Sequence, residues 1–319
     1  SEQLYAVQAW FDYGQVFQLR GMAGVTPESS VIDFDSSRPS FDGETNRLFA
    51  GGMFTYRVND FHRPFAYVLV QRDNNEEDTF GFPTLPIPYP DTKFHYDSVY
   101  WGVGSNGEIT AKLRYEVEFV YETGTSLSNT YDPDTLVNIT QTEDDISAWA
   151  ARMQLTWAFL DENVSRISVE AVYTSGDDDR DRDTSNVFGG NRPGTDDRAF
   201  NSLGYLNTGY AFSPSLSNLT MIRVGGSTYP LRSSSPQLFR RLQVGANVFF
   251  YFKSDADAPF DEPTTDDSYL GFEPDLYVNW RLASDLSFAV RYGVFFPGEA
   301  IDGSDAARHF LFTTVTYSF

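Results

Sequence analysis

The sequence contains no cysteine, and this absence removes several classes of protein. Without thiols there is no disulfide framework, no thiolate metal site and no cysteine nucleophile. Histidine is scarce as well, since only His62, His95 and His309 occur in 319 residues. The sequence also lacks the usual hydrolase, zinc-protease, phosphate-binding and dinucleotide-binding motifs, so few means of catalysis remain.

Long hydrophobic runs are missing too. No stretch of about 18 apolar residues exists, so the sequence predicts no transmembrane helix. Residues 1–3 show neither the basic nor the apolar part of a signal peptide, so we expect an exported form of this chain to be a mature one. Positive charge is sparse, with 23 Lys and Arg against 45 Asp and Glu and a net charge of −22, which argues against a nucleic-acid partner.

Aromatic residues are abundant. They make up 16% of the chain, yet the mean hydropathy is only −0.37. This combination is unusual for a soluble enzyme and suits a transmembrane β-barrel, which has an apolar outside, a polar inside and aromatic girdles. We predict an all-β, antiparallel barrel formed by residues 1–319 as a single domain.

Alternation of apolar and polar residues predicts twelve strands if residues 5–23 count as one strand, although they also fit two. Asn106-Gly107 predicts a tight hairpin turn between strands 93–103 and 108–124. Residues 201–212 alternate weakly and are predicted to be loop. The other predicted strands lie at 47–58, 64–72, 149–159, 167–173, 219–226, 238–253, 269–282, 286–296 and 307–319.

Long and short connections alternate along the chain, and the long ones are acidic. This asymmetry is typical of outer-membrane barrels, which have long external loops and short periplasmic turns. We expect the acidic loops to be solvated and to bind Ca²⁺ only loosely, because D-D-D-R-D-R-D lacks the glycine and the final glutamate of an EF-hand; no other cofactor is expected. The long loops are 24–45, 73–92, 125–143, 175–214 and 254–267.

The strand face opposite the apolar one carries most of the basic residues. A basic lumen would favour anionic solutes, whereas Arg–Glu ladders would only brace the barrel, and both interpretations can hold together. The basic residues on this face are Arg47, Arg57, Lys112, Arg114, Arg152, Arg166, Arg241, Lys253, Arg281 and Arg291. The acidic ones are Glu116, Glu118, Glu122, Glu170, Glu273 and Asp275.

The last thirteen residues, 307–319, form an amphipathic strand that ends on an aromatic residue. Such a strand resembles the closing strand of bacterial outer-membrane barrels, where a terminal aromatic serves in assembly. The aromatic residues predicted to form the membrane girdle are Trp149, Trp157, Trp280, Tyr317 and Phe319.

Four segments resemble the alginate-export family of outer-membrane porins. They are W-G-V-G-S-N-G-E-I-T-A-K-L-R-Y-E-V-E-F-V-Y-E-T-G (101–124), S-L-S-N-L (215–219) followed by P-L (230–231), G-F-E-P-D-L-Y-V-N-W (271–280) and Y-G-V-F-F-P-G-E-A (292–300). The resemblance implies about eighteen strands around an Arg-rich constriction that passes an anionic uronate polymer. This chain shows 12–14 strands, so it either closes as a smaller barrel or forms part of an 18-stranded one. The residues matching the constriction are Arg114, Arg152, Arg166, Arg241, Arg281 and Arg291.

Two other functions fit a barrel. A lipid hydrolase would need an activated Ser or water. However, His62 falls at a predicted turn, His95 and Ser98 point to opposite faces, and His309 falls on the lipid face. A structural barrel that anchors envelope proteins is the second alternative. We predict a bacterial outer-membrane channel that passes anionic oligo- or polysaccharides by passive diffusion, surrounded by outer-membrane lipid.

Overall fold

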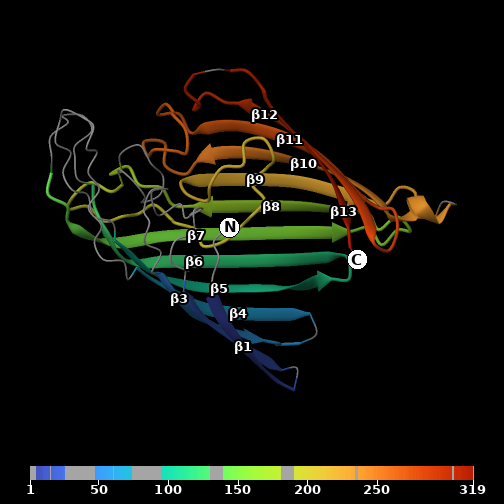
Figure 1. The fold of residues 1–319 in the computed structure, drawn as a ribbon, viewed down its shortest axis with the longest axis horizontal. Coiled ribbons are helices and arrows are strands. Elements are labelled where there is room, and N and C mark those ends of the chain that lie inside the picture. Colours follow the sequence, from blue (N-terminus) through green and yellow to red (C-terminus); the bar gives the residue numbers. More distant parts are fainter. Residues whose placement is uncertain are drawn as a thin grey trace.

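The chain forms one antiparallel sheet in which every strand pairs with its neighbours in sequence (Figure 1). The computed structural model describes residues 5–14, 16–25, 47–59, 61–73, 95–129, 139–180, 190–233, 236–303 and 305–318. Within these ranges the sheet has 13 strands, and a short 3₁₀ helix, η1 (Gln237–Arg241), is the only helical element. In that same part of the chain, no helix is long and apolar enough to cross a membrane.

Most strands are long, as a tilted membrane-crossing strand must be. They are β1 (Tyr5–Tyr13), β2 (Phe17–Val25), β3 (Arg47–Tyr56), β4 (His62–Asp73), β5 (Tyr96–Thr110), β6 (Leu113–Leu127), β7 (Glu143–Ala158), β8 (Arg166–Thr174), β9 (Leu219–Thr228), β10 (Leu242–Lys253), β11 (Tyr269–Arg281), β12 (Leu286–Pro297) and β13 (Arg308–Tyr317).

Residues 5–25 form two strands, so the count of twelve is one too low. Tyr13 and Phe17 close the β1–β2 ladder, and Gly14 between them has a φ of +52°, which glycine adopts at little cost. Among the described residues, β1 pairs only with β2 and β13 only with β12. A closed barrel and an 18-strand count therefore stay predictions.

The turn predicted at Asn106-Gly107 is wrong. Both residues pair on two sides, Asn106 with Arg63 and Glu116, and the β5–β6 turn comes later, between Thr110 and Leu113. Thr110 Oγ1 accepts the backbone N–H groups of Lys112 and Leu113 and so closes that turn. Gly107 has another reason to be glycine, because a Cβ there would lie 2.1 Å from the Phe61 carbonyl oxygen.

The two ends of the sheet carry different connections. Short turns join β1–β2, β3–β4, β5–β6, β7–β8 and β11–β12, and η1 lies between β9 and β10 at the same end. The segments at the other end are longer, and between β8 and β9 the described residues contain no strand, as predicted for 201–212. Predicted loops 24–45 and 73–92 lie almost entirely outside the described residues.

One face of the sheet, the outer face, is covered with exposed large apolar side chains. Trp101 is 52% exposed, Met153 47% and Trp157 43%. A contiguous apolar surface over so many strands is unfavourable in water and matches the lipid-facing band of a membrane barrel. The opposite, inner face carries the charged and buried polar residues, so it holds any site for a solute.

Candidate functional site on the inner face

The inner face divides into two halves along the strands. In the loop half, near the long connections, apolar side chains such as Phe249, Tyr251 and Phe295 are fully buried. In the turn half, near the short connections, the same strands carry residues such as Gln243, Asn247 and Arg291. The loop half is covered by residues 198–218 of the β8–β9 connection, named the inner loop below, whose Leu206, Ala211, Phe212 and Leu216 pack on the apolar residues.

A polar cavity of about 340 Å³ lies in the turn half, against the inner loop. Three arginines from three strands line it: Arg166 of β8, Arg223 of β9 and Arg291 of β12. None of the described residues that line it carries a carboxylate, so positive charge and neutral hydrogen-bonding groups meet there. The neutral lining residues are Gln154, Thr156, Ser168, Asn207, Tyr210, Gly226, Ser227, Asn247, Tyr277 and Asn279.

Arg166 and Arg291 have no carboxylate partner among the described residues. The Nε of Arg166 donates to Ser227 Oγ at 2.9 Å. Arg291 donates to Asn279 Oδ1 at 2.7 Å and lies over the Tyr277 ring, 5.5 Å from its centroid. Both guanidinium groups therefore keep their positive charge uncompensated at the cavity, where it can act on a solute.

Other inner-face charges compensate each other in a ladder across four strands. Arg152 of β7 pairs with Glu116 of β6 at 3.1 Å and with Glu170 of β8 at 2.7 Å. Glu170, which is fully buried, also pairs with Arg223 of β9 at 2.8 Å. Arg152 thus braces the sheet through ion pairs, whereas Arg166 and Arg291 make the inner face basic. Arg223 belongs to both the ladder and the cavity.

The remaining basic residues predicted to line the pore are spread along the strand ends. Arg47 is buried at the loop end of β3 and pairs with Asp73 at 3.6 Å. Lys112 is exposed in the β5–β6 turn, and Arg114 beside it pairs with Glu108. Arg57 directly follows β3, Arg241 ends η1, Arg281 donates to the carbonyl groups of Ala283 and Ser284, and Lys253 donates to carbonyl groups of the β10–β11 loop.

Sequence reasoning missed Arg223, although β9 alternates. Its inner positions read Leu219, Met221 and Arg223, so the face changes from apolar to basic within one strand. Arg20 and Arg63 were missed as well. Both share the inner face by register, and neither has a carboxylate within 4.0 Å in the described residues.

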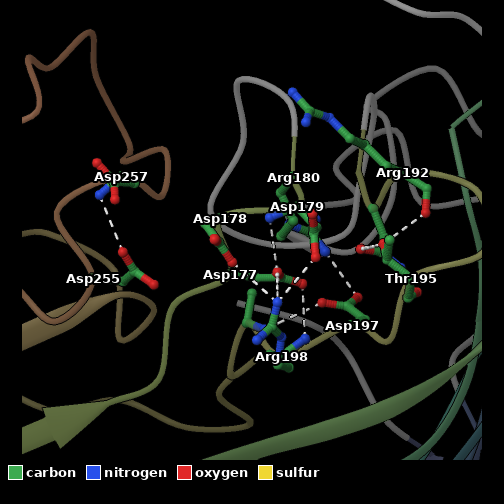
Figure 2. A network of polar contacts seen from close by, with 12 residues as sticks. Asp177, Asp178, Asp179, Arg180, Arg192, Thr195, Asp197, Arg198, Asp255 and Asp257 are labelled. Atoms are coloured by element: carbon green, nitrogen blue, oxygen red, sulfur yellow. Dashed lines mark hydrogen bonds and ion pairs between the residues drawn. The ribbon is translucent and has the colours of Figure 1, made fainter.

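The acidic run that opens the β8–β9 connection is bound by arginine. The Arg198 guanidinium lies 3.0 Å from carboxylate oxygens of both Asp178 and Asp179 and 3.6 Å from Asp177 (Figure 2). Burial raises the pKa of the Asp177 carboxyl. The three carboxylates are close enough together to share a metal ion, but Arg198 already provides a cation. Loose Ca²⁺ binding at the acidic loops stays a prediction.

Aromatic residues predicted for the girdle occupy the outer face. Trp149 stacks on Tyr173 with ring centroids 4.3 Å apart, and Trp157 lies further along β7, next to the short turn. Trp280 donates to the Leu238 carbonyl at 2.9 Å, and Tyr317 is 62% exposed at the end of β13. Phe319 lies outside the described residues.

The three histidines lie apart from the cavity. His62 contacts the Tyr115 hydroxyl at 3.1 Å, His95 lies 3.8 Å from Asp97, and His309 contacts the Tyr292 hydroxyl at 3.0 Å. Each histidine thus has a local structural partner, and none meets an arginine of the cavity. A sheet of long strands with an apolar outer face and a charged inner face is typical of the outer-membrane proteins that cross the membrane with β-strands.

Comparison with known proteins identifies the family. The family model described as "Alginate export" matches residues 30–313, and this chain belongs to that family. It is an outer-membrane channel protein and not an enzyme. No curated protein matches the sequence.

Solved structures share the fold at low sequence identity. The outer membrane protein OprD from Pseudomonas aeruginosa aligns with a TM-score of 0.50 and 13% identity over 97% of this chain and 67% of its own. The ferric enterobactin receptor of the same organism aligns with a TM-score of 0.51 and 9% identity over 93% of this chain. This chain spans 42% of that receptor's length.

Proposed function

We propose that the chain forms an outer-membrane channel that passes anionic saccharides by passive diffusion along its basic inner face. The observation that carries this proposal is the cavity where Arg166 and Arg291 lie with no carboxylate partner in the part of the chain that the structure describes. A positive charge beside a low-dielectric wall raises the local concentration of anions. The two guanidinium groups, which are held by neutral acceptors, would attract a carboxylate-bearing solute without holding it in a closed site.

The neutral lining residues suit a sugar. Asn207, Asn247, Asn279 and Gln154 offer amide donors and acceptors that can exchange with sugar hydroxyls, and Tyr210 and Tyr277 add aromatic surface. Many weak polar contacts favour passage, because a solute must bind well enough to enter and weakly enough to leave. The family description, alginate export, points to a saccharide as the cargo; among saccharides, the free arginines favour the anionic ones.

Reversal potential in a planar bilayer under a KCl gradient tests the proposal. The wild-type protein should prefer anions. Replacing Arg166 and Arg291 with Ala should lower the anion-to-cation permeability ratio about five-fold, which corresponds to about 1 kcal/mol of electrostatic free energy. Replacing Arg152, which is paired with two glutamates, or Arg114 and Arg281, which lie at strand ends, should change the permeability ratio less.

Arg232 provides the matched control. It lies in the β9–β10 connection, exposed and over the Tyr229 ring, so Arg232→Ala removes one positive charge away from the inner face and matches each single replacement, Arg166→Ala or Arg291→Ala. This variant should keep the wild-type permeability ratio. An equal loss of anion preference in Arg232→Ala and in either single replacement would mean that total charge, not the cavity, sets selectivity. A cation-preferring wild type would refute the proposal.

A further inference from the structure

The inner loop crosses the inner face from one side of the sheet to the other. Its yellow trace passes in front of β7–β9 in Figure 1. Polar and aromatic contacts tie it to β5 and β6 at one end and to β10, β11 and β12 at the other. A connection from the loop end of the sheet therefore runs within the concave side, where a solute would pass.

A single carboxylate fixes the far side of this loop. Glu273 of β11 is fully buried, and its oxygens accept the backbone N–H groups of Tyr210 at 2.5 Å, Ala211 at 2.7 Å and Phe212 at 2.8 Å. Hydrogen bonds to an ionised acceptor are about twice as strong as neutral ones. Three consecutive N–H groups converging on one carboxylate hold the loop backbone in one conformation.

A second carboxylate fixes the near side. Glu122 of β6, also fully buried, accepts the backbone N–H of Asn201 at 2.9 Å, and the Tyr100 hydroxyl donates to the Asn201 carbonyl at 2.8 Å. Tyr96 donates to the same carboxylate at 2.5 Å. Glu122 thus binds the loop at Asn201, and Glu273 binds it nine to eleven residues later. One glutamate lies on β6 and the other on β11.

Close packing at the Glu273 anchor depends on glycine. Gly209 has a φ of +116°, and a Cβ there would lie 2.4 Å from the Tyr251 hydroxyl. A Cβ on Gly293 of β12 would lie 3.0 Å from the Tyr210 Cβ and 2.5 Å from Asp275 Oδ1. Phe212 stacks on Phe295 with centroids 4.1 Å apart and 2° between the rings. The inner face of β10, β11 and β12 therefore packs closely against the inner loop.

The segment between the two anchors faces open space. Tyr205 is 87% exposed and Leu203 37%. A second cavity, of about 400 Å³, lies between this segment and the inner side of β4–β8, while Asn207 and Tyr210 form part of the basic cavity. The loop therefore separates the two spaces and lines both.

We infer that the inner loop is a fixed constriction that sets the largest solute able to pass, and that Glu122 and Glu273 are the positioning residues that hold it. This inference rests on the proposed channel function, but not on its anion preference. Glu273 acts through the loop backbone and does not line the basic cavity. Release of the loop should therefore change pore size more than charge selectivity.

The test uses Glu273→Gln, because a glutamine oxygen is neutral and its NH₂ group opposes the three N–H donors. Three readouts are needed: hydrogen exchange of residues 198–218, single-channel conductance, and the largest poly(ethylene glycol) that enters the pore. We expect exchange about ten-fold faster and conductance about two-fold higher, with entry of larger polymers. Glu108→Gln is the control, since Glu108 bonds Arg114 at the turn end, away from the loop.

Each possible result of this test either supports the inference or overturns it. Faster exchange with unchanged conductance and polymer limit would show that the loop does not constrict the pore, and unchanged exchange would show that Glu273 does not hold the loop; either overturns the inference. If Glu273→Gln fails to assemble, Leu203→Gly with Tyr205→Gly trims the exposed segment without touching an anchor. That variant must also raise the polymer limit, or the inference fails. A conducting wild type without anion preference would refute the proposed function alone.

Discussion

The two halves of the inner face use the same strands for different purposes. On β10, Phe249 and Tyr251 of the loop half are buried beneath the inner loop, whereas Gln243 and Asn247 of the turn half line open cavities. The loop half is a packed core that would be costly to expose, and the turn half is a hydrated surface with uncompensated arginines. A strand that crosses a membrane can therefore carry a core and a solute path on one face.

The difference explains where charge is compensated. Glu170 lies where the two halves meet and neutralises Arg152 and Arg223, which would otherwise be half-buried charges. Further into the turn half, Arg166 is exposed and Arg291 is partly buried. Neither has a carboxylate within 4.0 Å among the described residues, and Arg291 donates instead to Asn279 Oδ1 and to the carbonyl groups of Val278 and Val290. The arginines at the boundary are therefore paired with a carboxylate, whereas Arg166 and Arg291 are held by neutral acceptors.

Replacing Glu170 with Gln should have the largest effect. Removing one partner of a buried charge network costs about 3 kcal/mol of stability. The variant should unfold at lower temperature, judged by the shift between the folded and unfolded bands on a gel. It should also raise anion preference, because Arg223 loses its carboxylate beside the cavity. A fall in anion preference would contradict the assignment of Arg223 to the cavity.

Phe212→Ala should separate the loop half from the sheet beneath it. Loss of a fully buried phenylalanine costs about 3 kcal/mol. Phe212 is partly buried, so its loss costs less, and this cost falls on docking of the inner loop. We expect faster hydrogen exchange and faster proteolysis within residues 198–218. Phe250→Ala, on the outer face of β10, should leave both rates unchanged. Equal rates in the two variants would contradict a loop-covered core.

Asn279→Asp tests the turn half without changing its shape. The new carboxylate would lie where the Asn279 amide oxygen now accepts from Arg291 at 2.7 Å. Compensating this charge should lower the anion-to-cation permeability ratio about three-fold, measured as reversal potential, while the polymer limit stays constant. An unchanged ratio would mean that Arg291 does not act on the solute.

Arg114→Ala should have the smallest effect. Arg114 is 69% exposed and pairs with Glu108 near a turn, and exposed ion pairs contribute about 0.5 kcal/mol. Thermal stability should stay close to wild type, and the permeability ratio should change less than in Asn279→Asp. A larger change in the permeability ratio would mean that the selective region lies at the turn end of β6 and not at the cavity.

Sequence patterns predicted the strands because alternation between lipid and a polar interior repeats over long segments. The patterns failed where a residue is required by a tertiary contact. Gly107 is glycine because the Phe61 carbonyl approaches it closely, but in the sequence Asn106-Gly107 has the form of a turn. They also did not predict where the inner loop lies. The signal was present in V-F-F-Y-F (248–252), which is apolar on both faces and so requires a cover on the inner one. The arginines that have no carboxylate partner among the described residues could not be identified from sequence, because ion pairing depends on register across strands.

The most direct test of the central claim is block of the ionic current by short oligosaccharides. Oligouronates should interrupt the wild-type current, neutral oligomers of equal length should interrupt it far less, and the Arg166→Ala, Arg291→Ala double variant should lose this difference. Equal interruption by charged and neutral oligomers in the wild type would contradict a channel that selects anionic saccharides through these arginines.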